Sequence, residues 1–212
     1  MLVLASASPR RRELLTQAGF SFQVHPAHLP EEPNPGEDPI AYVTRLAREK
    51  AQAVFDELTA ASAAHREAGS AAAQEIEGLE GEPLVVLGAD TTVTLDNHIL
   101  GKPADAADAA RMLRLLSGRT HQVITGVALV TASSAEAAAE VTAVRFLTLS
   151  DEEIAAYIAT GEPMDKAGAY AIQGRAARWI PRIEGCYFNV VGLPIALVAS
   201  LLESGQLPAK TS

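Results

Sequence analysis

The stretch Leu84–Thr92, LVVLGADTT, decides the fold class. A continuous apolar run of this kind predicts a strand that is buried on both faces, as found inside a helix-covered sheet. In open α/β sheets, ligands bind beyond the carboxyl ends of the strands, and Asp90 falls where this strand is expected to end. A carboxylate there loses hydration and needs a positive partner. The stretch therefore predicts an α/β protein with a functional site at Asp90.

The composition narrows the class of protein. The chain of 212 residues fits one domain of ordinary size, or one domain with two lobes. A net charge of −9 argues against non-specific binding of nucleic acid. The only cysteine, Cys186, excludes an internal disulfide and fits a reducing compartment. No apolar run approaches the roughly 20 residues that span a bilayer, and the first residues lack a signal-peptide pattern. We therefore expect a cytoplasmic protein.

The N-terminal segment predicts an anion site. Leu2–Ala5 reads as a strand, and Ser8 and Pro9 are typical of a helix N-cap and first helical position. Arg10–Arg12 then fill the first turn, where the helix dipole repels cations. A bound anion would explain this placement, because free backbone N–H groups, hydroxyls and guanidinium groups form a phosphate cradle. A solvated basic turn paired with acids such as Glu13 explains it equally well.

A second helix is expected to begin at Asp38-Pro39. Lys50 lies on the apolar face of this helix, so it either extends along the surface to solvent or meets a buried anion. The loop before the helix, residues 25–38, is acidic and contains Glu31, which a solvated loop would also explain. The apolar stripe of the helix is predicted to consist of Ile40, Val43, Leu46, Ala47 and Val54.

Further elements follow along the chain. Residues 56–83 are expected to form a helix tail and a surface insertion without a chemical role, and residues 206–212 a frayed tail. Thr92–Leu100 predicts a hairpin with Asp96-Asn97 as its turn. His121–Thr131 predicts a strand that is interrupted at Thr125-Gly126. After an Ala/Ser turn at residues 132–139, residues 140–149 are expected to form a strand antiparallel to it.

Two more segments carry candidate functional residues. Gly161–Gly174, GEPMDKAGAYAIQG, is too polar and glycine-rich for a core element, which is typical of an ordered functional loop. Lys102 lies between a glycine and a proline, and an ordinary loop lysine is the alternative. His121 has no second histidine at metal spacing, so we favour a structural or positioning role for it. The candidates collected from the whole chain are Ser8, Arg10, Arg11, Glu31, Lys50, Asp90, Lys102, Asp165, Lys166 and Gln173.

This set of side chains suits a metal–polyphosphate site. Lysine and arginine bind phosphate oxygens, while carboxylates hold a divalent ion or orient water. The sequence contains neither a GxxxxGK[ST] loop nor a GxGxxG motif, the two familiar phosphate-binding patterns. The charged groups therefore have to converge from separate segments.

Seven motifs in order resemble the Maf family of nucleoside triphosphate pyrophosphatases. They are SASPRR (Ser6–Arg11), RLAREKA (Arg45–Ala51), GADTTV (Gly88–Val93), GKP (Gly101–Pro103), LSGRTHQVITGVAL (Leu116–Leu129), DKAGAYAIQG (Asp165–Gly174) and NVVGLP (Asn189–Pro194). The resemblance implies hydrolysis of a nucleoside triphosphate to the monophosphate and pyrophosphate with Mg²⁺ or Mn²⁺. It also implies a single domain, residues 1–205, with two lobes: an elongated mixed sheet with flanking helices and a central cleft, related to the inosine triphosphatase group. Members are often homodimers.

The resemblance also implies roles for individual residues. Asp90 matches the proton acceptor, and Arg10, Thr91 and Gln173 match the specificity residues of the dTTP/UTP branch. Ser8, Arg11, Glu31, Lys50 and Lys102 match cleft residues of the family. Of these, Ser8, Arg11, Lys50 and Lys102 are expected to bind phosphate, with Glu31, Asp165 and Lys166 as supporting residues. Asp90, together with Glu31, is expected to act either as a metal ligand or as the base, and the sequence leaves this open. Two departures are Ala171, where the family commonly has glycine, and the length of residues 56–83.

Alternatives remain open at this point. The same scaffold could act on 7-methyl-GTP or on modified nucleotides. A second alternative is a nucleotide-binding regulator of cell division. The physiological purpose stays open between sanitation of the nucleotide pool and control of division.

Overall fold

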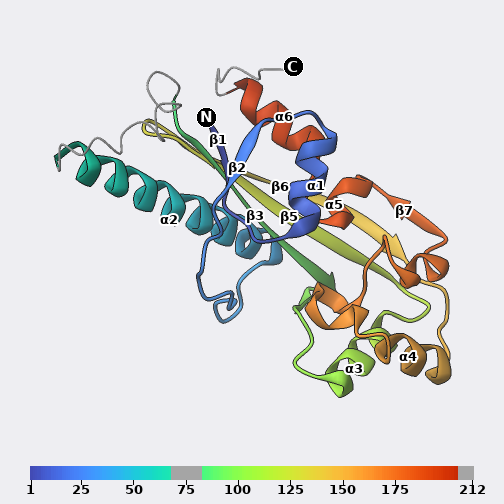
Figure 1. The fold of residues 1–212 in the computed structure, drawn as a ribbon. Helices are drawn as coiled ribbons and strands as arrows, with labels where there is room; N and C mark the ends of the chain where they lie inside the picture. Colours follow the sequence, from blue (N-terminus) through green and yellow to red (C-terminus); the bar gives the residue numbers. More distant parts are fainter. Residues whose placement is uncertain (68–82, 205–212) are drawn as a thin grey trace.

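The computed structural model describes residues 1–67 and 83–204, which form a mixed sheet flanked by helices (Figure 1). The strand order is β2-β1-β3-β5-β6-β7, and β4 pairs with β3. β1, β2 and β3 run parallel, and all other pairs are antiparallel. The strands are β1 (Leu2–Leu4), β2 (Phe22–Val24), β3 (Val85–Leu95), β4 (His98–Leu100), β5 (Thr120–Val130), β6 (Ala135–Arg145) and β7 (Arg182–Glu184). The predicted α/β fold with a mixed sheet and flanking helices is confirmed.

Local capping groups explain where several helices begin. The Asp38 carboxylate accepts the backbone N–H groups of Ile40 and Ala41 at the start of α2. Asp105 caps α3, and Ser150 forms a reciprocal capping box with Glu153 at α4. The helices are α1 (Pro9–Gln17), α2 (Pro39–Glu67), α3 (Ala106–Leu116), α4 (Asp151–Ile158), α5 (Tyr187–Val191) and α6 (Ile195–Ser204), with the short 3₁₀ helices η3 (Glu162–Asp165), η4 (Ala167–Ala169) and η5 (Arg175–Trp179).

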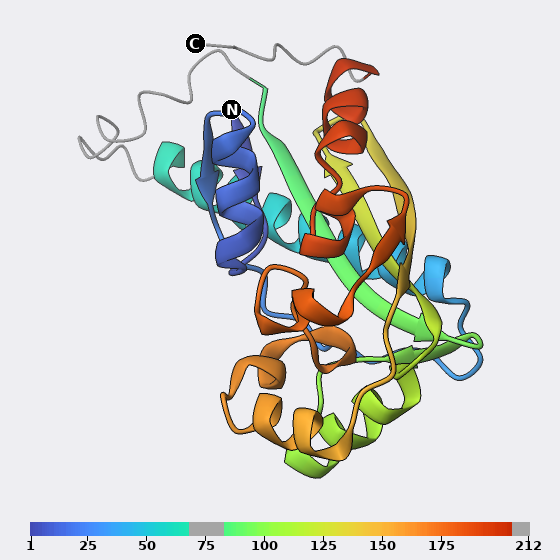
Figure 2. The ribbon, with the colours of Figure 1, turned by 90° about the vertical axis from the view of Figure 1, so that its right-hand side faces the viewer.

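The alternation of side chains along β3 divides the core into two layers. Leu87 and Ala89 pack with residues of α1 and α6 on one face, whereas Val86 packs with residues of α2 on the other. Figure 2 shows α1 and α6 on the near side of the sheet and α2 behind it. Because side chains alternate with a period of two, Asp90 faces α2 and Thr91 faces α1. None of the helices in the described ranges is long and apolar enough to cross a membrane.

Two glycines let α2 lie directly on the sheet. A Cβ at Gly88 would overlap the Ala47 carbonyl oxygen, and a Cβ at Gly126 would overlap the Val43 carbonyl. The prediction that Thr125-Gly126 interrupts its strand was wrong, because β5 runs without a break from Thr120 to Val130. The glycine marks a close approach of two backbones, which is a usual meaning of glycine inside a strand.

Two other expectations need correction. The predicted turn at residues 132–139 was too long, because β6 begins at Ala135 and its alanines pair with β5. Pairing with a neighbouring strand overrides the weak β-propensity of alanine. Ile40, expected in the buried stripe of α2, is 46% exposed.

The hairpin is confirmed, since Asp96 and Asn97 both have positive φ. The surface insertion and the frayed tail fall largely on residues 68–82 and 205–212, outside the described residues, although residues 56–67 continue α2.

A second apolar cluster surrounds His121 at the far ends of the strands, next to α3 and α4. His121 is 2% exposed, and its ring meets Phe146 and Tyr170 edge-on. Its Nε2 lies 2.8 Å from the Tyr170 hydroxyl, while Nδ1 has no partner among the described residues. Burial lowers the pKa of His121 to about 3. The imidazole is therefore a neutral structural group, as the sequence had favoured.

His121 should make the free energy of unfolding depend on pH. The unfolded chain protonates this histidine near pH 6.5 and the folded chain only near pH 3, so stability falls as the pH drops between these values. By linkage the loss is about 2 kcal/mol by about pH 5. We expect His121→Phe to flatten this part of the profile in urea titrations between about pH 5 and 8. Equal pH dependence for the variant and the wild type would contradict the assignment.

Candidate active site

The candidate site lies at a gap along one edge of β3. β5 pairs with the other edge from Val86 to Thr94. On the open edge, β1 pairs with β3 only as far as Leu87, and β4 begins to pair at Val93. Asp90 lies in this gap, in the middle of β3. The expectation that the strand ends at Asp90 was therefore wrong: the carboxyl end that opens the site belongs to β1.

A cavity of about 680 Å³ opens at this gap. Its volume is in the range of ordinary small-molecule sites. Gln173 is exposed and is absent from the cavity lining. The other residues predicted for the site all line the cavity: Ser8, Arg10, Arg11, Glu31, Lys50, Asp90, Thr91, Lys102, Asp165 and Lys166.

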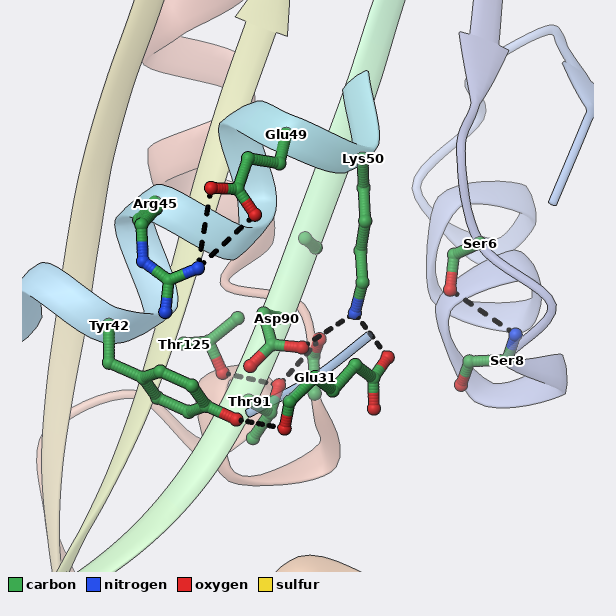
Figure 3. A network of polar contacts seen from close by, with 12 residues as sticks. Ser6, Ser8, Glu31, Tyr42, Arg45, Glu49, Lys50, Asp90, Thr91 and Thr125 are labelled. Atoms are coloured by element: carbon green, nitrogen blue, oxygen red, sulfur yellow. Dashed lines mark hydrogen bonds and ion pairs between the residues drawn. The ribbon is translucent and has the colours of Figure 1, made fainter. Parts of the chain in front are cut away.

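A buried lysine links two carboxylates at the centre of the site (Figure 3). The Lys50 ammonium donates to Asp90 Oδ1 at 2.7 Å and to Glu31 Oε1 at 2.5 Å. Lys50 and Asp90 are each 6% exposed, whereas Glu31 is partly exposed. Of the two alternatives for Lys50, the structure selects contact with a buried anion. The partner that Asp90 requires thus comes from α2, across the face of the sheet.

The two carboxylates differ in their readiness to bind a proton. Burial raises the pKa of Asp90, and the positive charges of Lys50 and Arg11 offset this only in part. Burial also acts to raise the pKa of Glu31, but there the bond and charge of Lys50, with help from Lys102, outweigh it and the pKa is lowered. Asp90 is therefore the more basic carboxylate, which suits a proton acceptor. Its Oδ1 is bonded to Lys50, and within the described ranges Oδ2 has no hydrogen bond to protein.

Arg11 is anchored on the opposite face of β3. Its Nε donates to the Gly192 carbonyl at 2.9 Å, and its Nη1 to the Ala89 carbonyl at 2.8 Å and to Ser6 Oγ at 3.1 Å. Its Nη2 donates to Thr91 Oγ1 at 3.1 Å. Burial lowers the pKa of Arg11, and nearby carboxylates counteract this effect. With four of its five N–H groups used, Arg11 is a fixed positive charge that keeps one donor for a ligand.

The remaining charged groups lie at the rim of the cavity. Lys102 Nζ is 3.3 Å from Glu31 Oε2, Arg10 Nη2 is 4.0 Å from Asp165 Oδ2, and Lys166 contacts the same Asp165 carboxylate. The cavity lining holds five cationic side chains and three carboxylates. This excess of two positive charges favours an anionic ligand.

The loop that carries Glu31 is held by residues of α2. The Tyr42 hydroxyl donates to the Glu31 carbonyl at 3.0 Å. Arg45 donates to both oxygens of Glu37 at 2.7 Å and to the Glu32 carbonyl at 3.2 Å. The bond from Arg45 lowers the pKa of Glu37 to about 2. The acidic loop is thus an anchored part of the site, although its composition alone also fitted a solvated loop.

Sequence reasoning missed three residues that the structure places at the site: Ser6, Tyr42 and Thr125. Tyr42 had a readable signal, because it lies four and eight residues before Leu46 and Lys50 and so shares their face of the helix. Ser6 accepts from Arg11, and Thr125 Oγ1 lies 2.9 Å from Thr91 Oγ1. These two contacts depend on tertiary packing, and the local sequence carries no sign of them.

The comparisons with known proteins agree with this geometry. A family model described as "Maf-like protein" matches residues 1–205. A protein of Koribacter versatilis named "dTTP/UTP pyrophosphatase" is 53% identical over 202 residues, which is 95% of this chain and 93% of that protein. Proteins with the same name from Geobacter sulfurreducens and Bacillus pumilus are 52% and 46% identical, over 97% and 96% of this chain and 97% and 95% of their own lengths. This chain belongs to the Maf family.

Proposed function

We propose that this protein hydrolyses nucleoside triphosphates, dTTP and UTP in particular, to the monophosphate and pyrophosphate. The observation that carries the proposal is the buried Asp90–Lys50 pair in a cavity with an excess of positive charge. A polyphosphate chain would satisfy that excess. The names of the relatives support dTTP and UTP as the nucleotides.

Residues on the two faces of β3 have different roles in the proposed reaction. Asp90 accepts a proton from a water molecule through Oδ2 as the water oxygen forms a bond to the α-phosphorus. The bond from the α-phosphorus to the bridging oxygen breaks, and pyrophosphate leaves with the electron pair. Lys50 holds Asp90 in place and shares the phosphate charge with Lys102 and Arg11. Ser8 lies at the free N-terminus of α1, where backbone N–H groups favour an anion.

The residues present fit a divalent metal such as Mg²⁺ or Mn²⁺. Asp90 Oδ1 and Glu31 Oε1 both accept from the Lys50 ammonium, so these two oxygens lie within about 5 Å of each other. The described part of the chain holds no cluster of three or more metal-binding side chains. One or two carboxylates together with substrate phosphates is the usual binding mode of Mg²⁺. Such an ion would neutralise charge on the triphosphate and on the leaving pyrophosphate.

Arg10, Thr91 and Gln173 are proposed to set nucleotide preference. Arg10 lines the cavity and is part of its rim. The Thr91 hydroxyl contacts Arg11 and Thr125, so it acts on the nucleotide at least in part through the position of Arg11. Gln173 lies outside the lining, and its part in reading the pyrimidine stays a prediction. A homodimer, a cytoplasmic location and a single two-lobed domain over residues 1–205 also stay predictions.

Hydrolysis in ¹⁸O-labelled water tests the proposed reaction. With dTTP or UTP and Mg²⁺ or Mn²⁺, we expect pyrophosphate and a monophosphate that carries the label, because the water oxygen attaches to the α-phosphorus. Label in pyrophosphate would contradict the attack on the α-phosphorus. A panel with 7-methyl-GTP and modified triphosphates decides between the specificities. Binding of nucleotide without hydrolysis of any triphosphate would instead favour a regulatory nucleotide-binding protein.

A further inference from the structure

The carboxylate of Glu162 connects the two ends of the loop Gly161–Gly174. The backbone N–H of Arg175 lies 3.1 Å from Glu162 Oε1 and 3.3 Å from Oε2. The Tyr157 hydroxyl donates to Oε1 at 2.7 Å. The segment that carries Asp165, Lys166 and Gln173 therefore starts and ends at the same side chain.

Tyr157 connects the Glu162 carboxylate to Ala171, which lies in the second half of the loop. Its side chain is buried at 1% exposure, and its hydroxyl oxygen accepts the backbone N–H of Ala171 at 3.2 Å. Burial, together with the bond to Glu162, raises the pKa of Tyr157, so the hydroxyl stays protonated as a donor. Ala171 follows Tyr170, which lines the cavity. The Tyr157 hydroxyl thus connects Glu162, at the ends of the loop, to the residue that follows Tyr170 in the cavity lining.

Glycines allow the loop to close tightly. A Cβ at Gly174 would overlap the Glu162 carboxylate, so a side chain there would displace that carboxylate from its bonds to Tyr157 and Arg175. Gly168 has a φ of +67°, and a Cβ there would lie 2.8 Å from Val93 of β3. The loop therefore lies directly against β3 at Gly168 and against the Glu162 carboxylate at Gly174.

We infer that Glu162 and Tyr157 are positioning residues for substrate binding at the site proposed above. Neither lines the cavity, and their effect passes through the loop. Lys166, which lines the cavity, contacts Asp165, and Asp165 pairs with Arg10 at 4.0 Å. Release of the loop would displace Lys166 and leave Arg10 without its partner. The inference rests on the proposed function for its substrate and on the loop geometry for its residues.

The test separates positioning from simple stabilisation by kinetics. We expect Glu162→Ala to raise KM for dTTP about tenfold, with a smaller change in kcat, because uniform binding is lost. Glu162→Gln keeps an oxygen that accepts from Arg175 and Tyr157, so it should restore KM to within about twofold of the wild type. Tyr157→Phe retains the edge-on ring contact with Trp179 and removes only the hydroxyl. It should raise KM in the same direction as Glu162→Ala.

Glu153 provides the matched control on the same region of the fold. Its carboxylate accepts from Trp179 Nε1 at 3.1 Å and from the backbone N–H of Ser150 at 2.9 Å, and it does not touch the loop or the cavity. Glu153→Ala should lower the melting temperature and leave KM at the wild-type value. Equal KM values for Glu162→Ala and Glu153→Ala would overturn the positioning role.

Amide hydrogen exchange tests the same inference without any substrate. Glu162→Ala should increase exchange at residues 164–174, and Glu153→Ala should not. Unchanged exchange in that segment for Glu162→Ala would overturn the inference even if hydrolysis is confirmed. Conversely, absence of hydrolysis by the wild-type protein would overturn the proposed function and leave the exchange result valid for the loop, so the two failures are distinguishable.

Discussion

Replacement of Asp90 by asparagine should lower kcat/KM for dTTP by about 10²–10⁴-fold, the usual contribution of a positioned acid or base. Asparagine keeps an oxygen for the Lys50 ammonium but cannot accept a proton from water. The fold should survive, because the asparagine oxygen keeps the bond to the Lys50 ammonium and the Glu31 carboxylate still neutralises that ammonium. Steady-state kinetics measure kcat/KM, a thermal melt measures the stability of the fold, and calorimetry measures binding of dTTP. Turnover of Asp90→Asn near the wild-type rate would contradict the assignment of Asp90 as proton acceptor.

Asp105→Asn is the matched control for this variant. Asp105 caps α3 and lies outside the cavity lining, and asparagine caps helices as well as aspartate does. Both activity and stability should remain at the wild-type level. In the wild type, kcat/KM should fall as the pH drops through the raised pKa of Asp90, above the range of an ordinary aspartate. This acid limb should be absent from the residual activity of Asp90→Asn.

Replacement of Lys50 by methionine should destabilise the fold by about 3–5 kcal/mol near pH 8, the usual cost of removing one partner of a buried ion pair. Asp90 would remain buried without its nearest positive charge, and its pKa would rise further. In the unfolded chain Asp90 titrates near pH 3.9. The folded variant would hold its proton to a higher pH, so the loss of stability grows as the pH rises through that window. The destabilisation should therefore be smaller near pH 5 than near pH 8, as measured by urea unfolding.

Arg48→Met is the control for this experiment. Arg48 is an exposed cation on the same helix, two residues from Lys50, and exposed substitutions of this kind usually change stability by less than about 0.5 kcal/mol. A loss of stability in Lys50→Met that is independent of pH would contradict the pairing with Asp90. Activity of Lys50→Met should fall along with that of Asp90→Asn, because Lys50 orients the proposed base.

Most of the local structure could be predicted from neighbouring residues. Ser150 and Asp105 are capping residues by chemistry, and Asp96-Asn97 can adopt the positive φ that a tight hairpin needs. These signals act within a few residues, so they are visible in sequence. The errors came where distant segments intervene. The prediction that Gly126 interrupts its strand was wrong, because this glycine allows the backbone of α2 to approach β5. The alanines of β6 are strand residues because β5 lies beside them.

The candidate residues of the site were predicted more completely than their arrangement. Cations beside a helix N-terminus and an inward lysine indicated an anion, and motif resemblance assigned the rest. Gln173 is the exception, because it lies outside the cavity lining. Glu37 and Glu162 were not recognised as residues that hold loops at the site, because their roles arise from bonds to those loops rather than from their own sequence patterns.

The amino-acid residues alone predict that a buried strand carries Asp90 and that side chains on successive residues of this strand face opposite sides. The same local information shows which residues could cap helices, turn the chain or bind phosphate, since these properties depend on local sterics and chemistry. The folded arrangement of distant segments sets the end of β1 opposite Leu87, which leaves the edge of β3 open at Asp90. It likewise brings Lys50, 40 residues away along the chain, to that carboxylate. Strand register and helix docking set both features, and they result from packing of the whole core rather than from any one segment.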